Sequence, residues 1–239
     1  YILIGGAILL AIITPSRFYV NDLLEKLNYS KELSPKMSEL YKCNYKEHEF
    51  IILVTGYGKE NIGSSLRYAC MKYNVKAVVL MGTAGSIKDG NDIFSSIVPV
   101  STLQFDVDFM PNGYGAGQIP MLEKALYKTN DDLKECLIRA SSIAGISYND
   151  DILASSDTFV TNYNLASSIR REYNAGAVDC EAGAVGEFCY VNNISYACIK
   201  VISNFANNNV IKQCNLYDEE SSKICQRIMN KFLKEFYEA

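Results

Sequence analysis

The amino-acid sequence predicts an α/β protein in which helices cover both faces of a β-sheet. Two observations lead to this prediction. Short, apolar, β-rich runs alternate with helical patterns along the chain, which is the pattern of α/β folds. Several of these runs are apolar almost throughout, as expected for strands buried on both faces. The chain has 239 residues, enough for one sizeable domain with a large core.

The expected elements follow in chain order. Strands are predicted at 49–55, 76–81, 92–100, 151–154 and 195–203. Helices are predicted at 61–73, 164–173, 181–192 and 219–237. The apolar N-terminal run is interpreted as a buried strand that turns at Gly5-Gly6. It lacks the basic start of a signal peptide, and it is shorter than the roughly 18 residues that span a bilayer.

Composition excludes several classes of protein. The net charge is −4 and the basic residues are scattered, so we expect no nucleic-acid partner. The eight cysteines show no C-x-x-C spacing, and there is a single histidine. We therefore expect reduced cysteines in a cytoplasmic protein, without a metal, an organic cofactor or a membrane partner.

Glycine-rich segments follow two of the predicted strands, where α/β sheets bind ligands. Residues 56–63 contain the spacing G-x-G-x-x-G, but a tight strand-to-helix turn is a better interpretation than a dinucleotide site. Gly82-Thr83-Ala84-Gly85 follows the predicted strand 76–81. Its backbone N–H groups are expected either to cradle an anion or a sugar oxygen, or to form a plain turn.

Three further side chains stand at the ends of predicted strands. Phe159 follows a polar run and either presents an aromatic face for stacking or packs in the core. Glu181 begins an apolar helix, so it either caps the helix dipole or accepts hydrogen bonds from a sugar diol. Asn204 ends the last strand. Its amide donates one hydrogen bond and accepts another, which suits a purine edge, although asparagine is also common at turns and caps.

The order of these motifs resembles the nucleoside phosphorylase superfamily, and within it most closely the 5′-methylthioadenosine/S-adenosylhomocysteine nucleosidases. The likeness runs from about Glu49 to about Ala206. It rests on these segments: 56–59 (GYGK), 82–86 (GTAGS), 106–108 (DVD), 117–120 (GQIP), 154–160 (ASSDTFV), 179–183 (DCEAG) and 202–204 (ISN). The resemblance implies one domain over 1–239, a three-layer α/β/α fold around a central mixed β-sheet.

The resemblance also implies roles for individual residues. Phe159 stacks on a purine, and the Val160 backbone holds the purine edge. Glu181 binds the ribose hydroxyls, and Cys180 lies against the sugar where the family usually has methionine. The resemblance also places Asp179 and Ser156 among the residues that bind the substrate. It places Thr83, Ala84 and Gly85 near the nucleophile.

Two departures from the family bear on chemistry. Asn204 stands at the position of the catalytic aspartate that protonates purine N7, and an amide has no such proton to give. Acid–base catalysis of this kind is worth about 10²–10⁴-fold. The nucleosidases also carry a glutamate after the first strand to activate water, whereas residues 6–11 here contain no carboxylate.

These departures leave several functions open. We expect cleavage of the N-glycosidic bond of a purine nucleoside, by phosphorolysis or hydrolysis. Arg17 lies in a segment that faintly resembles a phosphate-binding loop of the phosphorylases, so phosphate is a candidate co-substrate. The alternatives are a futalosine-type 6-oxopurine nucleosidase and a non-catalytic nucleoside-binding or storage protein. The resemblance further implies a homodimer or larger homo-oligomer, with Phe105 and residues 114–120 completing a neighbour's pocket.

Overall fold

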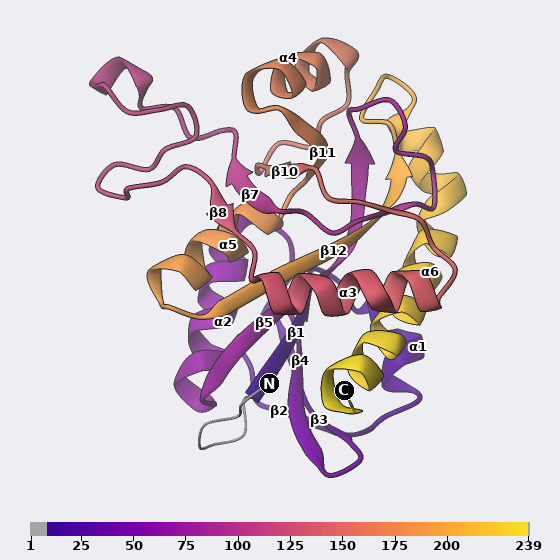
Figure 1. Cartoon of the computed structure of the whole chain (residues 1–239). Coiled ribbons are helices and arrows are strands. Elements are labelled where there is room, and N and C mark those ends of the chain that lie inside the picture. The colour runs from indigo at the N-terminus through magenta and orange to yellow at the C-terminus, as the bar shows by residue number, and fades with distance from the viewer. Residues whose placement is uncertain (1–8, 239) are drawn as a thin grey trace.

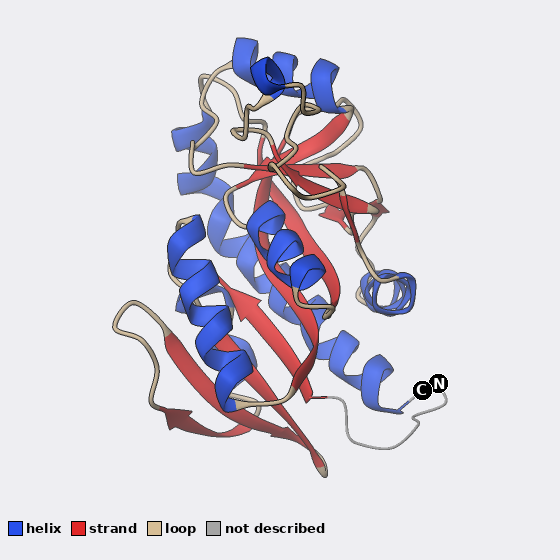
Figure 2. Cartoon of the chain, turned by 90° about the vertical axis from the view of Figure 1, so that its left-hand side faces the viewer, coloured by secondary structure: helices blue, strands red, loops and turns tan. Residues whose placement is uncertain are grey.

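The computed structural model describes residues 9–238, and in it helices flank a central sheet on both faces (Figures 1 and 2). The strands are β1 (Leu9–Thr14), β2 (Asn28–Glu32), β3 (Glu39–Tyr45), β4 (His48–Val54), β5 (Val75–Ser86), β6 (Ser96–Ile97), β7 (Ser101–Gln104), β8 (Tyr127–Lys128), β9 (Tyr148–Asn149), β10 (Ile152–Ser155), β11 (Ala175–Asp179) and β12 (Ser195–Asn204). The α-helices are α1 (Asn21–Leu24), α2 (Lys59–Lys72), α3 (Asp131–Ile143), α4 (Tyr163–Tyr173), α5 (Ala182–Val191) and α6 (Val210–Glu238). Two 3-10 turns are η1 (Arg17–Tyr19) and η2 (Met110–Asn112).

The sheet is mixed, which confirms the predicted fold class. Its main path runs β2-β3-β4-β1-β5-β11-β10-β7-β8, and β12 pairs with β5 as well. Strand β1 is parallel to β4 and β5, and β5 is parallel to β12. The pairing of β5 with β11 is antiparallel. Strand β5 therefore joins the two parts of the sheet, and its end lies where they meet.

The core has a layer on each face of the sheet. One layer packs apolar residues of α1, α3 and α6 against it, including Leu137, Ile228 and Phe232. The other packs α2 and α5, through residues such as Leu66 and Val185. The buried positions of α6 recur every three or four residues, as expected for a helix with one apolar face.

The turn predicted at Gly82–Gly85 is wrong, because β5 continues through Ser86. On one side this segment pairs in parallel with residues 200–204 of β12, and on the other Gly85 and Ser86 pair with Val178 and Ala177. Strands β11 and β12, which are distant in sequence, thus supply the hydrogen-bond partners of this segment, whereas the sequence pattern predicts a local turn.

Other predicted boundaries also changed. Most of the strand predicted at 92–100 is irregular, with only Ser96–Ile97 in a strand and Phe94 at a positive φ of 72°. Helix α6 begins at Val210 rather than at 219, and the sequence did not predict the β2–β3 hairpin or α3. The turn expected at Gly5-Gly6 lies outside the described residues.

The structure bears on three expectations from composition. All eight cysteines are free thiols, five of them buried. In the described chain no helix is long and apolar enough to cross a membrane. Within residues 9–238 no group of three or more acidic, histidine or cysteine side chains is placed to hold a metal ion.

Candidate active site

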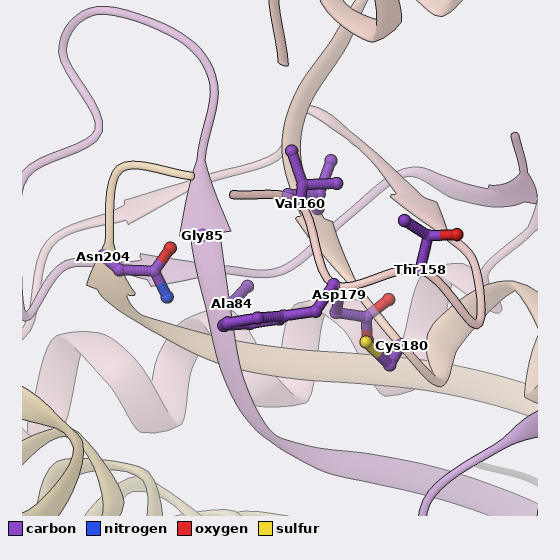
Figure 3. Close-up of a pocket in the computed structure, with 9 residues that line it drawn as sticks. Ala84, Gly85, Thr158, Val160, Asp179, Cys180 and Asn204 are labelled. Carbon is purple, nitrogen blue, oxygen red and sulfur yellow. The ribbon is translucent and has the colours of Figure 1, made fainter. Parts of the chain in front are cut away.

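A pocket opens where the end of β5 meets the end of β12, the loop after β10 and the start of α5 (Figure 3). Its cavity volume is about 50 Å³, which is smaller than the roughly 300–1,000 Å³ typical of small-molecule sites. The lining residues are Ala84, Gly85, Thr158, Phe159, Val160, Val178, Asp179, Cys180 and Asn204. Most of the residues that the sequence assigned to a purine nucleoside are therefore brought together.

Asn204 forms one end of this pocket, and Cys180 and Asp179 lie at the other (Figure 3). The Asn204 side chain is buried, with 5% of its surface exposed. The Ala206 backbone N–H donates to Asn204 Oδ1 at 2.9 Å. Because an N–H group needs an acceptor, this contact fixes which end of the amide is oxygen.

The amide nitrogen of Asn204 faces the opposite way from this contact. Nδ2 lies 3.3 Å from Ser203 Oγ and 3.6 Å from Cys214 Sγ, and can donate to both. The oxygen accepts from the backbone and both Nδ2 hydrogens have acceptors, so the amide donates to a ligand only if one of the long Nδ2 contacts, at 3.3 and 3.6 Å, is given up. The alternative that Asn204 serves a turn is also correct in part, because it closes the turn to Ala206.

Gly85 makes room for Asn204. A Cβ atom built on Gly85 would lie 2.4 Å from Asn204 Oδ1 and 3.2 Å from the Ala206 Cβ. The first contact is closer than packed atoms allow, and it is to a side chain held by the backbone; the second is tight. Glycine at this position is therefore a requirement of the amide's placement.

The loop after β10 presents Phe159 and Val160. The Phe159 ring lines the pocket while 49% of its surface stays exposed, and Val160 is buried beside it. Ser156 does not line the pocket; its hydroxyl donates to the Thr158 carbonyl and accepts from the Thr158 N–H. The exposed ring contradicts the interpretation of Phe159 as a core residue and leaves a face for stacking.

At the other end of the pocket lies a buried charge network that the sequence analysis missed. Lys200, in β12, is fully buried, and its Nζ lies 2.6 Å from Glu181 Oε2 and 3.0 Å from Asp179 Oδ2. A buried charge needs paired and hydrogen-bonded neighbours. The sequence signal was a lysine within an otherwise apolar strand.

Asp179 forms the start of α5. Its carboxylate accepts from the Ala182 N–H at 3.1 and 3.2 Å and from the Ser155 hydroxyl, and Ser155 Oγ accepts from the Gly183 N–H. Glu181 makes no such side-chain capping bond. The capping interpretation of Glu181 is therefore wrong, since Asp179 caps the helix and leaves Glu181 paired with Lys200.

Burial shifts the pKa values of this network. Burial raises the pKa of Glu181 to about 7, although Lys200 lowers it and Asp179 raises it further. Burial also lowers the pKa of Lys200, but the charges of Glu181 and Asp179 outweigh this and hold it well above its usual value. The lysine is thus a cation whose charge two carboxyl groups already balance.

Hydroxyl groups lie beside this network. The Tyr19 hydroxyl is 3.0 Å from Thr83 Oγ1. It also lies close enough to the Tyr57 hydroxyl to lower the pKa of Tyr57, which burial raises overall. Neither tyrosine was assigned from the sequence, because each follows its strand through an irregular loop.

Two residues assigned from the sequence lie away from the pocket. The Arg17 guanidinium donates to Asn21 Oδ1 at 3.0 Å, lies 3.8 Å from Glu39 and sits over the Tyr41 ring. Phe105 packs in a smaller core cluster, and its carbonyl accepts from the Tyr173 hydroxyl. The loop after β1 is Pro15–Val20 rather than residues 6–11, and it also contains no carboxylate.

A family model described as the phosphorylase superfamily matches residues 9–238. The chain belongs to this superfamily. Among similar sequences, the 5′-methylthioadenosine/S-adenosylhomocysteine nucleosidase of Buchnera aphidicola subsp. Schizaphis graminum is 27% identical over 198 residues, covering 81% of this chain and 84% of that protein. The nucleosidase of Staphylococcus aureus strain JH9 is 25% identical, covering 79% and 82%.

Solved structures of the superfamily share the fold. Futalosine hydrolase of Helicobacter pylori superposes with a TM-score of 0.90 at 20% identity, covering 96% of this chain and 98% of that one. The nucleosidase of Neisseria meningitidis, in complex with methylthio-immucillin-A, gives 0.89 at 21% identity, covering 94% and 98%. This phosphorylase-superfamily chain therefore has the fold that the sequence predicted.

Proposed function

We propose that this protein hydrolyses the N-glycosidic bond of a purine nucleoside and prefers a 6-oxopurine base. The observation that carries the proposal is the fixed amide of Asn204 at one end of a pocket whose other end holds Asp179, which shares the Lys200 cation with the buried Glu181. The named activities of the related nucleosidases support cleavage of a purine nucleoside.

The base preference follows from the Asn204 amide. Its oxygen is held by the Ala206 N–H, so the group available to a ligand is one Nδ2 hydrogen, released from its long contact with Ser203 Oγ or Cys214 Sγ. On the edge that contains N7, a 6-oxopurine presents two acceptors, whereas adenine presents an acceptor and a donor. Two donors facing each other leave one unpaired, which costs about 1–3 kcal/mol in a buried site.

Glu181, paired with Lys200, binds the ribose in this proposal. A carboxylate held by Lys200 accepts hydrogen bonds from the ribose hydroxyls, and its charge favours the oxocarbenium-like character that the ribose gains as the bond breaks. Asn204 donates a hydrogen bond to the departing base, which stabilises the charge that develops on the purine, and the purine takes up the proton that the attacking water loses.

Water is the nucleophile that suits this electrostatic environment. Lys200 faces two carboxyl groups and Arg17 faces Glu39, so neither cation is free for phosphate. Burying a phosphate beside Glu181 would place like charges together in a low dielectric. The Tyr19 and Thr83 hydroxyls suit a neutral nucleophile.

Base release measures this function directly. The full chain is incubated with inosine, guanosine, adenosine, methylthioadenosine and futalosine, with and without phosphate, and the bases are separated chromatographically. We expect hypoxanthine or guanine to be released about 10- to 100-fold faster than adenine, at a rate independent of phosphate. Asn204→Ala should abolish the preference, and Asn208→Ala, an exposed asparagine, is the matched control.

Other outcomes would replace the proposal. Phosphate-dependent release that is lost in Arg17→Ala would establish a phosphorylase. Preferred release of adenine would contradict the assignment of Asn204. Nucleoside binding without release of any base would leave a binding or storage protein.

We further propose a homodimer in a reducing compartment such as the cytoplasm. The loop between β7 and β8 projects from the sheet (Figure 1) and exposes Phe109, Met110 and Met121, by 42%, 46% and 94%. Exposed apolar side chains of this kind are typical of subunit contacts, and free thiols are typical of reducing compartments. Sedimentation of the full chain as a monomer would contradict the dimer.

A further inference from the structure

A carboxyl group that the proposed chemistry does not use lies behind Asn204. It belongs to Asp218, in α6, and its Oδ1 atom is buried with no hydrogen-bond partner in the described part of the chain. An orphaned carboxyl oxygen is costly to bury. The burial of this oxygen without a partner therefore calls for an explanation.

Helix α6 places Asp218 between the loop after β1 and the end of β12. One turn further along, the Ser222 hydroxyl donates to the Phe18 carbonyl at 2.9 Å, and Ser221 Oγ lies 3.5 Å from the Ile202 carbonyl. One turn earlier, Cys214 Sγ accepts from Asn204 Nδ2. Residues four apart lie on one face of a helix, so Asp218 sits between these two contacts.

The neighbours of Asp218 are also the neighbours of Asn204. Burial raises the pKa of Asp218, and the nearby Ser203 hydroxyl and Cys214 thiol lower it in part, although Oδ1 itself has no hydrogen-bond partner in the described residues. Both of these groups accept from Asn204 Nδ2. Each carries a single hydrogen that rotates freely to meet an acceptor.

We propose that Asp218, in its ionised form, is a positioning residue that holds the Asn204 amide in the orientation required by the base, a role that rests on the proposed function. The carboxylate draws the Ser203 and Cys214 hydrogens toward itself, and their lone pairs then face Asn204 Nδ2. A protonated Asp218 donates instead. The Ser203 or Cys214 hydrogen then turns toward the amide nitrogen, where two donors oppose each other.

The titratable groups facing Asp218 are Cys214 on its own helix, Tyr19 from η1 and Tyr57 from the loop after β4. Burial raises the pKa of Cys214 to about 11, and it raises the pKa values of both tyrosines above their usual value. None of them titrates in the acidic range. A change in Asn204 at acidic pH is therefore assigned to Asp218 when it persists in Glu181→Gln, because Glu181 also titrates, with a pKa of about 7.

Kinetics of the full-length chain test this role through the coupling of two sites. We expect Asp218→Asn to lower kcat about 10- to 100-fold, to leave KM within about threefold, and to remove one ionisation from the acidic side of the kcat profile, while the ionisation of Glu181, whose pKa is about 7, remains. In an Asn204→Ala background the same substitution should have no further effect on kcat. Glu219→Gln, an exposed neighbour on the same helix, is the matched control. Equal losses in both backgrounds, or no loss in either, would overturn the proposal.

A spectroscopic readout keeps the test independent of catalysis. The side-chain ¹⁵N–¹H₂ resonances of Asn204, assigned by comparison with Asn204→Ala, should titrate with one acidic midpoint in the wild type and stay constant in Asp218→Asn. Resonances that do not change with pH in the wild type would overturn the role of Asp218 even in an active enzyme. A titrating amide in a protein that releases no base would uphold it while the proposed hydrolysis fails.

Discussion

The two ends of the pocket are built on opposite electrostatic principles. Around Glu181 a fully buried lysine and two carboxyl groups lie within ion-pair distance. Around Asn204 the groups in contact are an amide, a hydroxyl, a thiol and a backbone N–H. The fixed charges stand at the Glu181 end, which we propose as the sugar end, whereas the groups that contact the amide at the Asn204 end, which we propose as the base end, are neutral hydrogen-bonding groups.

This difference indicates which property of the protein a substitution at each end will affect. A buried ion network fails when one partner is removed, because the remaining charges lose their compensation. A neutral hydrogen-bond array fails when its geometry shifts, because donors and acceptors no longer meet. We expect substitutions at the sugar end to affect folding, and substitutions at the base end to affect turnover.

The largest effect is expected from Lys200→Met, which leaves two carboxyl groups buried without a cation. Removing one partner of a buried pair costs about 3–5 kcal/mol, so the free energy of unfolding should fall by this amount in urea denaturation. Lys76→Met, on the exposed side of β5, is the control and should change it by less than about 0.5 kcal/mol. Equal stability of the two variants would show that the network contributes little to folding.

A smaller effect, confined to turnover, is expected from Gly85→Ala. The new Cβ would lie 2.4 Å from Asn204 Oδ1, and displacing a positioning group by about 1 Å can cost about 10²-fold in rate. Steady-state assays should show this loss while the urea midpoint changes little. Gly63→Ala has open space around its Cβ and should leave turnover at the wild-type value. An active Gly85→Ala would contradict the placement of the amide.

The smallest effect, when measured per pH unit, is a pH dependence of stability from Glu181. Because burial raises the pKa of Glu181 to about 7, the folded state binds more protons than the unfolded state between pH 4.5 and pH 7. This group's contribution to stability is therefore complete below about pH 4.5 and is lost as pH rises to about 7. The stability difference between wild type and Glu181→Gln should change by at most about 1.4 kcal/mol per pH unit. A difference that stays constant with pH would show that Glu181 remains ionised.

The sequence predicted the fold class and placed Phe159, Glu181 and Asn204 at strand or helix ends where the structure has them. These predictions succeeded because each depends on local chemistry, such as an apolar run followed by a polar side chain. Lys200 and Asp218 were missed because their roles depend on partners brought together by the sheet and by α6. The supposed turn at 82–85 failed for the same reason, since its backbone partners are more than ninety residues away in sequence, from Ala177 to Asn204.

The position of β5 also determines how rarely the backbone beside the pocket opens to solvent. Among its last residues, Gly82 to Gly85 pair with β12 on one edge, and Gly85 and Ser86 pair with β11 on the other. Backbone amides at the centre of such a ladder exchange their hydrogens with solvent only when the sheet opens as a whole. Amide exchange at residues 82–86 should therefore follow global unfolding, and heating should abolish the pocket and the fold in a single event.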